Sequence, residues 1–430
     1  MSKENSAGGN LYFEKRAEQN ERLSVGSKIL VVSDSSDEGW LAEHGKEPLM
    51  NGVKSFTETI VPMLKINYEV DFLHPFVVDK HEQRIFTTTP LPMYPQLEIV
   101  ADNPFETYRK LRKKLKHDQP DALFIATAEG VLGFLTMMAS NSLGDEVKNG
   151  KVKYTLSYTT NLDQYAAQCI QEYTSGFLKP NPDFFQPFIR LAYQQAEHIL
   201  VTTPTMQQKL NSFGIHNTTL WPRGIDTDLF HSKEKEEENP FKQFDWMKKD
   251  LLPILIYFGR ISNQKNIEDF LRITQEELSS VCGTKFHKVL IGNGPDKEQL
   301  QTLYADPHTH FLGAMERNML AIYLRWSDIF VFPSVTDTFG NVILEAGASG
   351  VPTVGYKEDA NGISIGSQDV IKNGINGYKV PYGIGNLLIG IKQARRIDPY
   401  QCIDHVRNTY SWNTAIDTLL RNMSKNKWKK

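Results

Sequence analysis

The stretch Phe332-Pro-Ser-Val-Thr-Asp-Thr-Phe-Gly-Asn-Val-Ile-Leu-Glu345 has the pattern of a buried strand end, a glycine-containing turn and a helix start. It carries two carboxylates, Asp337 and Glu345, eight positions apart. The free N–H groups of a helix start favour an anion such as phosphate, whereas carboxylates accept hydrogen bonds from paired hydroxyls. Two interpretations are open: a nucleotide-sugar site, or an ordinary strand–turn–helix crossover with two solvated acids.

Length and composition restrict the class of protein. A chain of 430 residues with 40% hydrophobic and 23% charged residues is typical of a globular protein with two domains. A net charge of −3 argues against a nucleic-acid partner. Cys169, Cys282 and Cys402 are far apart and fit neither a disulfide framework nor a metal site, which indicates a reducing compartment. No apolar run approaches the roughly 20 residues that span a bilayer, and the polar N-terminus lacks a signal-peptide core. We therefore expect a cytoplasmic protein.

Strand and helix patterns alternate in two series, which predicts an α/β protein with two parallel doubly wound sheets. The first series has apolar strand candidates at 28–33, 68–73, 122–126, 154–158 and 198–202, and the second at 253–258, 288–291, 310–312, 329–332 and 353–355. Between them lies Trp221-Pro-Arg-Gly-Ile-Asp226, followed by a charged stretch at 232–238. The predicted organisation is a tail at 1–24, Rossmann-like domains at 25–221 and 222–404, and a segment at 405–430 that packs back on the first domain.

Several polar or glycine-rich clusters follow predicted strands, where open parallel sheets bind their ligands. Tyr257-Phe-Gly-Arg260 with Lys265 can clamp a diphosphate, although a solvated Arg–Lys pair is the more common fate of such residues. Ile291-Gly-Asn-Gly-Pro295 permits a tight turn with its backbone near a ligand. Asn51-Gly52 can present N–H groups to a phosphate. The last two clusters are equally well explained as plain turns.

Together these clusters resemble the retaining family-4 glycosyltransferases, which have the two-domain GT-B fold with two Rossmann-like domains facing across a cleft. The resemblance extends from about Lys28 to Trp412. Within the family, the chain is most similar to bacterial mannosyltransferases and to sulfolipid or glycolipid synthases. It rests on the clusters above together with three further motifs, which are Phe124-Ile-Ala-Thr-Ala-Glu-Gly-Val-Leu-Gly133, Ser157-Tyr-Thr-Thr-Asn161 and Trp221-Pro-Arg-Gly-Ile-Asp-Thr-Asp-Leu-Phe230.

The resemblance implies a role for each matching residue. Arg260 and Lys265 hold the donor diphosphate, Asp337 contacts the transferred sugar, and Glu345 holds the ribose. Thr159 and Glu129 contact the acceptor or the sugar. No metal is needed, because Arg, Lys and helix dipoles neutralise the phosphates. Asp226-Thr-Asp228 has the form of a metal motif, but it falls in the inter-domain segment and is interpreted as structural. The remaining donor-binding residues are Gly52, Gly259, Asn293, Gly294, Phe339, Gly340, Asn341 and Val342.

Three positions depart from the family pattern. Asp337 stands where the family usually has Glu, Gln264 stands where it commonly has Glu, and Thr159 replaces a His that contacts the transferred sugar. A threonine can hydrogen-bond a sugar hydroxyl but cannot titrate. The predicted function is retaining transfer of a hexose from a UDP- or GDP-sugar to a lipid or glycan hydroxyl, in which the leaving phosphate accepts the acceptor's proton. The alternatives are a non-catalytic nucleotide-sugar binder or partner subunit, and a phosphorylase-like or epimerase-like enzyme.

Two further features bear on partners. The basic stretch at 109–116 either contacts an anionic membrane surface peripherally or forms a solvated helix face with Leu111 and Leu115 toward the core. Phe184, Phe185 and Phe188 recur at near-helical spacing in a predicted helix at 184–196, which favours packing inside the protein.

Overall fold

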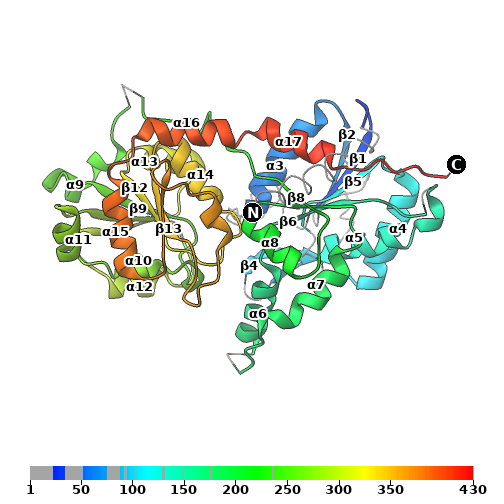
Figure 1. Cartoon of the computed structure of the whole chain (residues 1–430), viewed down its shortest axis with the longest axis horizontal. Helices are drawn as coiled ribbons and strands as arrows, with labels where there is room; N and C mark the ends of the chain where they lie inside the picture. The colour runs from blue at the N-terminus through cyan, green and yellow to red at the C-terminus, as the bar shows by residue number, and fades with distance from the viewer. Residues whose placement is uncertain are drawn as a thin grey trace, which may run out of the picture. The chain divides into compact units, whose positions relative to one another are not determined.

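The computed structural model describes residues 23–33, 52–74, 88–91, 94–100, 102–127, 131–148, 150–174, 177–234 and 237–429. The chain divides into two units, each with its own sheet (Figure 1). Unit 1 comprises Met1–Thr202, Gln207–Trp221 and Asn413–Lys430, and unit 2 comprises Thr203–Met206 and Pro222–Trp412.

Unit 1 is built on a six-stranded parallel sheet with the order β2-β1-β5-β6-β7-β8. The central strands β5 and β6 are buried along their whole length, as expected where helices cover both faces of a parallel sheet. This doubly wound order confirms the Rossmann-like prediction for the first series. The strands are β1 (Lys28–Val32), β2 (Glu69–Leu73), β5 (Ala122–Ile125), β6 (Thr155–Tyr158), β7 (His198–Val201) and β8 (Thr218–Leu220).

One prediction about the helices of unit 1 was wrong. Instead of one helix at 184–196, a 3₁₀ turn at Pro182–Phe185 leads into α7, and Phe184 and Phe188 are 64% and 61% exposed. An antiparallel hairpin of β3 (Thr88–Leu91) and β4 (Tyr94–Val100) was also not predicted. The helices are α3 (Gly52–Lys65), α4 (Pro104–Asp118), α5 (Val131–Asn141), α6 (Leu162–Tyr173), α7 (Gln186–Tyr193) and α8 (Pro204–Ser212), most of which belongs to unit 1.

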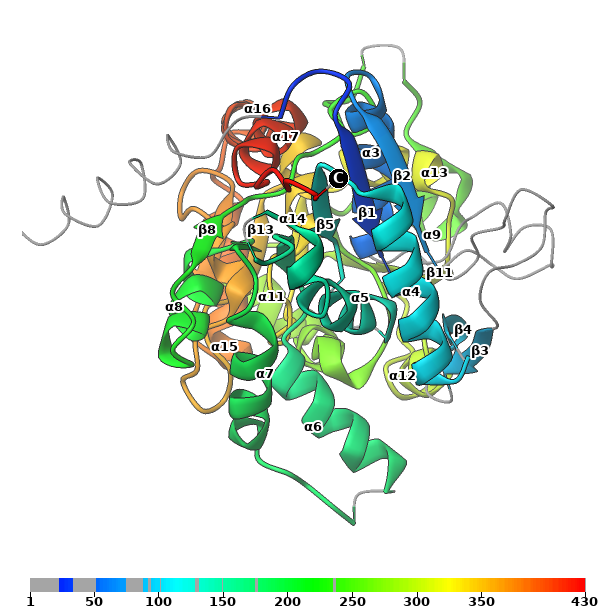
Figure 2. The same cartoon turned by 90° about the vertical axis from the view of Figure 1, so that its right-hand side faces the viewer.

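Helix α4 contains the basic stretch and lies beside β2 in unit 1 (Figure 2). Leu111 and Leu115 are buried, as expected of a helix with one core-facing side. Lysines next to these leucines in the sequence pair with neighbouring carboxylates, which agrees with a solvated helix face. These pairs are Lys110–Asp102 at 2.9 Å, Lys114–Asp118 at 2.7 Å and Lys116–Glu146 at 2.6 Å.

Unit 2 repeats the same architecture with a parallel sheet of order β11-β10-β9-β12-β13-β14. Its strands are β9 (Ile254–Phe258), β10 (His287–Ile291), β11 (Thr309–Gly313), β12 (Ile329–Phe332), β13 (Thr353–Tyr356) and β14 (Gly377–Val380). Its helices are α9 (Asp245–Lys249), α10 (Ile267–Leu271), α11 (Gln275–Cys282), α12 (Lys297–Leu303), α13 (Arg317–Arg325), α14 (Asn341–Ala348), α15 (Ile384–Ala394) and α16 (Pro399–Thr409). The prediction of a second Rossmann-like domain is confirmed.

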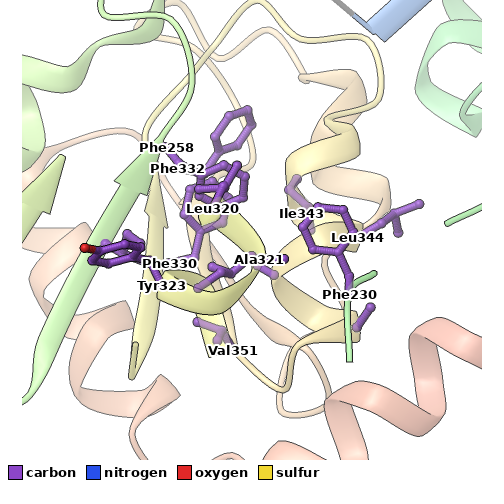
Figure 3. Packing of buried hydrophobic residues seen from close by; sticks show 14 of the residues in the cluster. Phe230, Phe258, Leu320, Ala321, Tyr323, Phe330, Phe332, Ile343, Leu344 and Val351 are labelled. Atoms are coloured by element: carbon purple, nitrogen blue, oxygen red, sulfur yellow. The ribbon is translucent and has the colours of Figure 1, made fainter. Parts of the chain in front are cut away.

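Alternate residues of the unit 2 strands face two separate cores. Ile256 and Phe258 of β9 join a cluster with α13 and α14, whereas Leu255 and Tyr257 join a cluster with α10, α11 and α15. Figure 3 shows the first cluster, in which aromatic rings from the strands lie beside Leu320 of α13. Because side chains alternate along a strand, both faces of the sheet are covered and the strand ends are left for ligands.

The last segment of the chain returns to unit 1. Helix α16 belongs to unit 2, and α17 (Trp412–Arg421) carries the chain across the boundary. The Trp221 indole N–H donates to the carbonyl of Ala415 at 2.7 Å, and the Trp428 indole N–H donates to that of Pro120 at 3.0 Å. The segment at the end of the chain, including lysines of the basic tail, is thus docked on unit 1 from Asn413 onward. In the described part of the chain, the helices are all too short or too polar to cross a membrane.

Three histidines meet at one end of the unit 2 sheet. Nε2–H of His287 donates to the carbonyl of Asp250 at 2.9 Å, which leaves its Nδ1 to accept from Nε2 of His310 at 3.1 Å. The Trp246 ring stacks on His310 with ring centroids 3.8 Å apart, and His308 lies next to His287. Burial, followed by the charge of His287, lowers the pKa of His310 to about 4, and burial lowers the pKa of His287.

This cluster predicts acid sensitivity of unit 2. In the unfolded chain this histidine has a pKa of about 6.5, so below that pH it binds a proton that folded His310 does not bind until about pH 4. The free energy of unfolding therefore falls as the pH falls from about 6.5 toward 4. His310→Gln keeps a donor toward His287 but cannot titrate. We expect a shallower fall of the free energy of unfolding between pH 6.5 and 4.5, measured by urea unfolding. The exposed His216→Gln is the matched control, and equal slopes for the two variants would contradict the prediction.

Candidate functional site

The predicted donor-side residues of unit 2 gather at the carboxyl ends of three neighbouring strands, β10, β9 and β12. Arg260 and Lys265 follow β9, Asn293 and Gly294 follow β10, and Asp337 follows β12. The strand order reverses at β9, because β10 and β11 lie on one side of it and β12 to β14 on the other. Ligands of open α/β sheets bind at such a reversal. The topology thus brings together residues that are far apart in the sequence.

The loops after β9 and β10 run against each other. The amide of Gly259 donates to the carbonyl of Ile291 at 3.0 Å, and that of Ile261 donates to the carbonyl of Asn293 at 2.9 Å. A Cβ atom at position 294 would lie 2.0 Å from the carbonyl oxygen of Ile261, so only glycine fits there. The buried Tyr257 hydroxyl donates to the carbonyl of Arg260 at 2.8 Å. Burial first, and then the charge of Asp337, raises the pKa of this tyrosine.

Lys265 and Asp337 form an ion pair in the centre of this region. Lysine Nζ lies 2.8 Å from Oδ1 and 2.7 Å from Oδ2 of Asp337, and the Ser334 hydroxyl donates to Oδ2. The side chains of the lysine and the aspartate are 22% and 23% exposed. The resemblance implied that Lys265 binds the donor diphosphate and that Asp337 contacts the transferred sugar. The structure adds that each is the other's partner.

Helix α14 begins directly behind Asp337. Gly340 precedes it with φ 81°, a left-handed conformation that favours glycine. Asn341 and Val342 open the helix, and the first N–H groups of a helix have no intrahelical acceptor. Phe339 is buried and its ring lies against Tyr410 with centroids 6.0 Å apart. Packing in the core therefore fixes this loop and the start of α14. The first N–H groups of α14 lie at the strand ends.

Glu345 lies in the second turn of α14, and its hydrogen-bond partner differs from that of Asp337. Its Oε1 accepts a hydrogen bond of 2.8 Å from Nη2 of Arg317, the first residue of α13. Burial raises the pKa of Glu345, Arg317 opposes this shift, and Asp226 adds to it. Sequence reasoning missed Arg317, because a single arginine at a helix start has no motif that distinguishes it from a solvated one.

The predicted residues of unit 1 lie at the carboxyl edge of its own sheet. Gly52 is the first residue of α3, the helix between β1 and β2, and Thr159 directly follows β6. Strands β1 and β6 are separated only by β5. Glu129 and Asn51 lie outside the described residues.

Asp226 has the structural role that the sequence suggested. Its Oδ1 accepts hydrogen bonds from the amides of Asp228 at 3.1 Å and Leu229 at 3.0 Å, as an aspartate does when it caps a turn. Among the residues that the structure describes, no group of three or more His, Cys, Asp or Glu side chains is arranged to hold a metal ion.

Two family models match the chain. Residues 50–229 match "Glycosyltransferase Family 4", and residues 252–389 match "Glycosyl transferases group 1". The first match lies largely in unit 1, and the second lies entirely in unit 2 and includes the strand-end loops described above. The order of the two matches is the order that the sequence motifs predicted.

Curated relatives of this chain are glycosyltransferases. It is 26% identical to the sulfoquinovosyl transferase SQD2 of Arabidopsis thaliana over 270 residues, which cover 62% of this chain and 47% of that protein. It is also 26% identical to a GDP-mannose-dependent alpha-mannosyltransferase of Mycobacterium tuberculosis, over 73% of this chain and 75% of the relative. The alignment therefore spans about half the length of the plant protein and three quarters of the bacterial one.

A solved structure shares the fold. Sucrose-phosphate synthase from Thermosynechococcus elongatus matches 91% of this chain and 97% of its own, with a TM-score of 0.63 and 17% identity. At this identity the match concerns the fold, which is that of two Rossmann-like domains in one chain.

The Lys265–Asp337 contact predicts energetic coupling between the two residues. In a double-mutant cycle of Lys265→Met and Asp337→Asn, we expect a coupling energy of about 1 kcal/mol, because each single change leaves a partly buried charge without its partner. The free energies of unfolding in urea provide the measurement. The exposed pair Lys248–Asp245, 3.2 Å apart, is the matched control and should show coupling near zero. Additive effects at Lys265 and Asp337 would refute the pairing.

Proposed function

Because this chain belongs to the family-4 glycosyltransferases, which have the GT-B fold, we propose that it is a retaining glycosyltransferase. The donor is a hexose linked to UDP or GDP, and the acceptor is a hydroxyl group of a lipid or glycan. The observation that carries this proposal is the gathering of Arg260, Lys265 and Asp337 with the start of α14 at the reversal point of the unit 2 sheet.

In this proposal the diphosphate of the donor lies between the loop after β9 and the start of α14. Arg260 provides a planar donor fork and Lys265 a compact positive charge. The amides of Asn341 and Val342 add the helix dipole, which also favours an anion. Together these groups supply the charge stabilisation that a bound metal supplies elsewhere, so we propose that transfer needs no metal cofactor.

Binding of the donor changes the partner of Lys265. The ammonium now binds both oxygens of Asp337, and a diphosphate placed at the strand ends competes with that carboxylate for it. As Lys265 turns to the phosphate, Asp337 becomes available to accept hydrogen bonds from hydroxyls of the transferred sugar. Lys265 then stabilises the negative charge that develops on the leaving phosphate.

The reaction itself is a substitution at the anomeric carbon. The bond from that carbon to the diphosphate oxygen breaks, the bond to the acceptor oxygen forms on the same face, and the acceptor's proton passes to an oxygen of the leaving phosphate. In this proposal Asp337 accepts hydrogen bonds from the Ser334 hydroxyl and from hydroxyls of the sugar, and it forms no covalent bond to the anomeric carbon. The protein then contributes positioning and charge stabilisation.

The relatives do not identify the sugar, the base or the acceptor of this protein, because their names specify different sugars. From the resemblance we propose that Thr159 and Glu129 contact the sugar or acceptor and that Gly52 is a donor-binding residue. We also propose that the protein is cytoplasmic and contacts the membrane peripherally when its acceptor is a lipid. Family membership favours catalysis over a non-catalytic nucleotide-sugar binder, and product formation distinguishes the two.

The first experiment identifies the donor and then tests the clamp. UDP-, GDP- and ADP-sugars are screened by thermal shift, since a bound ligand raises the unfolding temperature. With the donor that binds, we expect Arg260→Ala and Lys265→Ala each to lower kcat/KM for transfer at least tenfold, because each removes charge that stabilises the leaving diphosphate. Arg272→Ala and Lys249→Ala, exposed positions in the same unit, are the matched controls.

Unchanged transfer in both Arg260→Ala and Lys265→Ala would refute the clamp. Donor binding without transfer to any lipid or glycan acceptor would favour the non-catalytic alternative.

Two further measurements examine the mechanism with the same donor. NMR of the new glycosidic linkage should show the anomeric configuration of the donor, and an inverted product would exclude the same-face route. Transfer should also persist in EDTA, because protein groups neutralise the diphosphate, and its loss would show that a metal is required.

A further inference from the structure

Arg317 lies between a buried carboxylate and a buried aromatic ring. Its Nη2 donates to Oε1 of Glu345 at 2.8 Å, and its guanidinium carbon lies 5.2 Å from the centre of the Phe230 ring. The Glu345 side chain is 10% exposed, and Phe230 is fully buried. An arginine that stacks on a ring and donates to a carboxylate is held in one orientation.

The Phe230 ring is itself fixed by the segment before it. Asp226 caps the turn through Oδ1, and its carbonyl accepts from the amide of Phe230 at 3.0 Å. Phe230 then packs in the core cluster with Leu344 and Ile343 of α14 (Figure 3). The ring, the guanidinium and the carboxylate thus form one stack that is anchored at both ends.

The stack leaves specific hydrogen-bonding capacity unused. Glu345 contacts Arg317 through Oε1, so Oε2 is the oxygen left to accept from another group. Nε of Arg317 is buried, and the described residues provide no acceptor for it. A buried carboxylate prefers to be neutral unless a positive charge compensates its lost hydration. In this site Arg317 supplies that charge.

We propose that Arg317 is a positioning residue of the nucleotide-sugar site: it holds Glu345 ionised and oriented through Oε1, so that Oε2 accepts hydrogen bonds from the ribose hydroxyls of the nucleotide. This inference rests on the proposed function. It assigns a role to a residue that no sequence motif marked, and it separates Arg317 from the phosphate-binding Arg260 and Lys265.

The chemistry requires the ionised carboxylate. An ionised glutamate only accepts hydrogen bonds, whereas a protonated one turns an acceptor into a donor and binds a diol less well. Burial raises the pKa of Glu345, and among the charged groups that act on it Arg317 lowers the pKa while Asp226 raises it. Helix α16, which also packs on α14, meets it through Val406 at Gly347. Removing Arg317 therefore raises the pKa of Glu345 further and weakens ribose binding most strongly at low pH.

The test measures binding of UDP and GDP by calorimetry at pH 6.0, 7.0 and 8.5 in the full chain. For the nucleotide that binds the wild type, we expect Arg317→Met to weaken affinity at least tenfold at pH 6.0, with partial recovery at pH 8.5. Arg317→Lys keeps the positive charge and should retain the pH profile of the wild type. In transfer assays, Arg317→Met should raise KM for the donor far more than it lowers kcat.

A 2′-deoxynucleotide separates ribose recognition from a general structural role. It lacks one of the hydroxyls assigned to Oε2, so the wild type should bind it more weakly, and Arg317→Met should weaken it much less than the ribonucleotide. Equal losses for the two nucleotides, or a pH-independent loss, would overturn the inference. The double variant Arg317→Met/Glu345→Gln removes the unpaired buried charge, and it should regain stability without regaining affinity.

The proposed function and this inference fail differently. If neither UDP nor GDP binds the wild-type protein, the proposed UDP- or GDP-sugar site is wrong, and the inference falls with it. If one of them binds and Arg317→Met, folded by thermal unfolding, binds it equally well at every pH, only the role of Arg317 is wrong.

Discussion

The close approach of two backbone loops is the constraint on which the candidate site depends. Beyond the last residue of β9, Gly259 donates to the carbonyl of Ile291 at the end of β10, and Ile261 donates to that of Asn293 in the loop after β10. The ladder of the sheet thus extends past its strands and reaches the residues that carry charge. Gly294 allows this approach, because its missing side chain leaves room for the carbonyl of Ile261. Arg260 and Lys265 are positioned by a rigid sheet edge and not by a free loop.

Much of the fold could be predicted because it depends on short-range patterns. Buried parallel strands are continuous apolar runs, and glycine-rich turns after them mark the strand ends. Exposed and irregular pieces were less predictable. Pro90 lies in the β3–β4 hairpin, where proline argues against a strand in the sequence. Phe184 and Phe188 have the spacing of a packed helix face but lie exposed around a 3₁₀ turn, because spacing does not report whether a partner surface exists.

The candidate site shows the same division at the level of residues. The glycines, Arg260, Lys265, Asp337 and Glu345 were found from motifs that follow strands. Their contacts were not, since Lys265 and Asp337 are 72 positions apart and only the strand order makes them neighbours. Arg317 was missed for the same reason, as it meets Glu345 from a different helix, 28 positions away. A linear motif can identify a chemical group but does not identify the group that faces it.

The two ion pairs of the site differ in a way that suits different tasks. Lys265 and Asp337 are each about one-fifth exposed and are joined by a flexible ammonium side chain. Water reaches this pair, so exchanging the carboxylate for a diphosphate costs little desolvation. Glu345 is more deeply buried, and its partner is a planar guanidinium that stacks on Phe230. Breaking that pair would leave a buried charge uncompensated. In the proposed enzyme the Lys265–Asp337 pair therefore opens to bind the reacting part of the donor, while the Arg317–Glu345 pair stays closed around its buried carboxylate and holds the nucleoside.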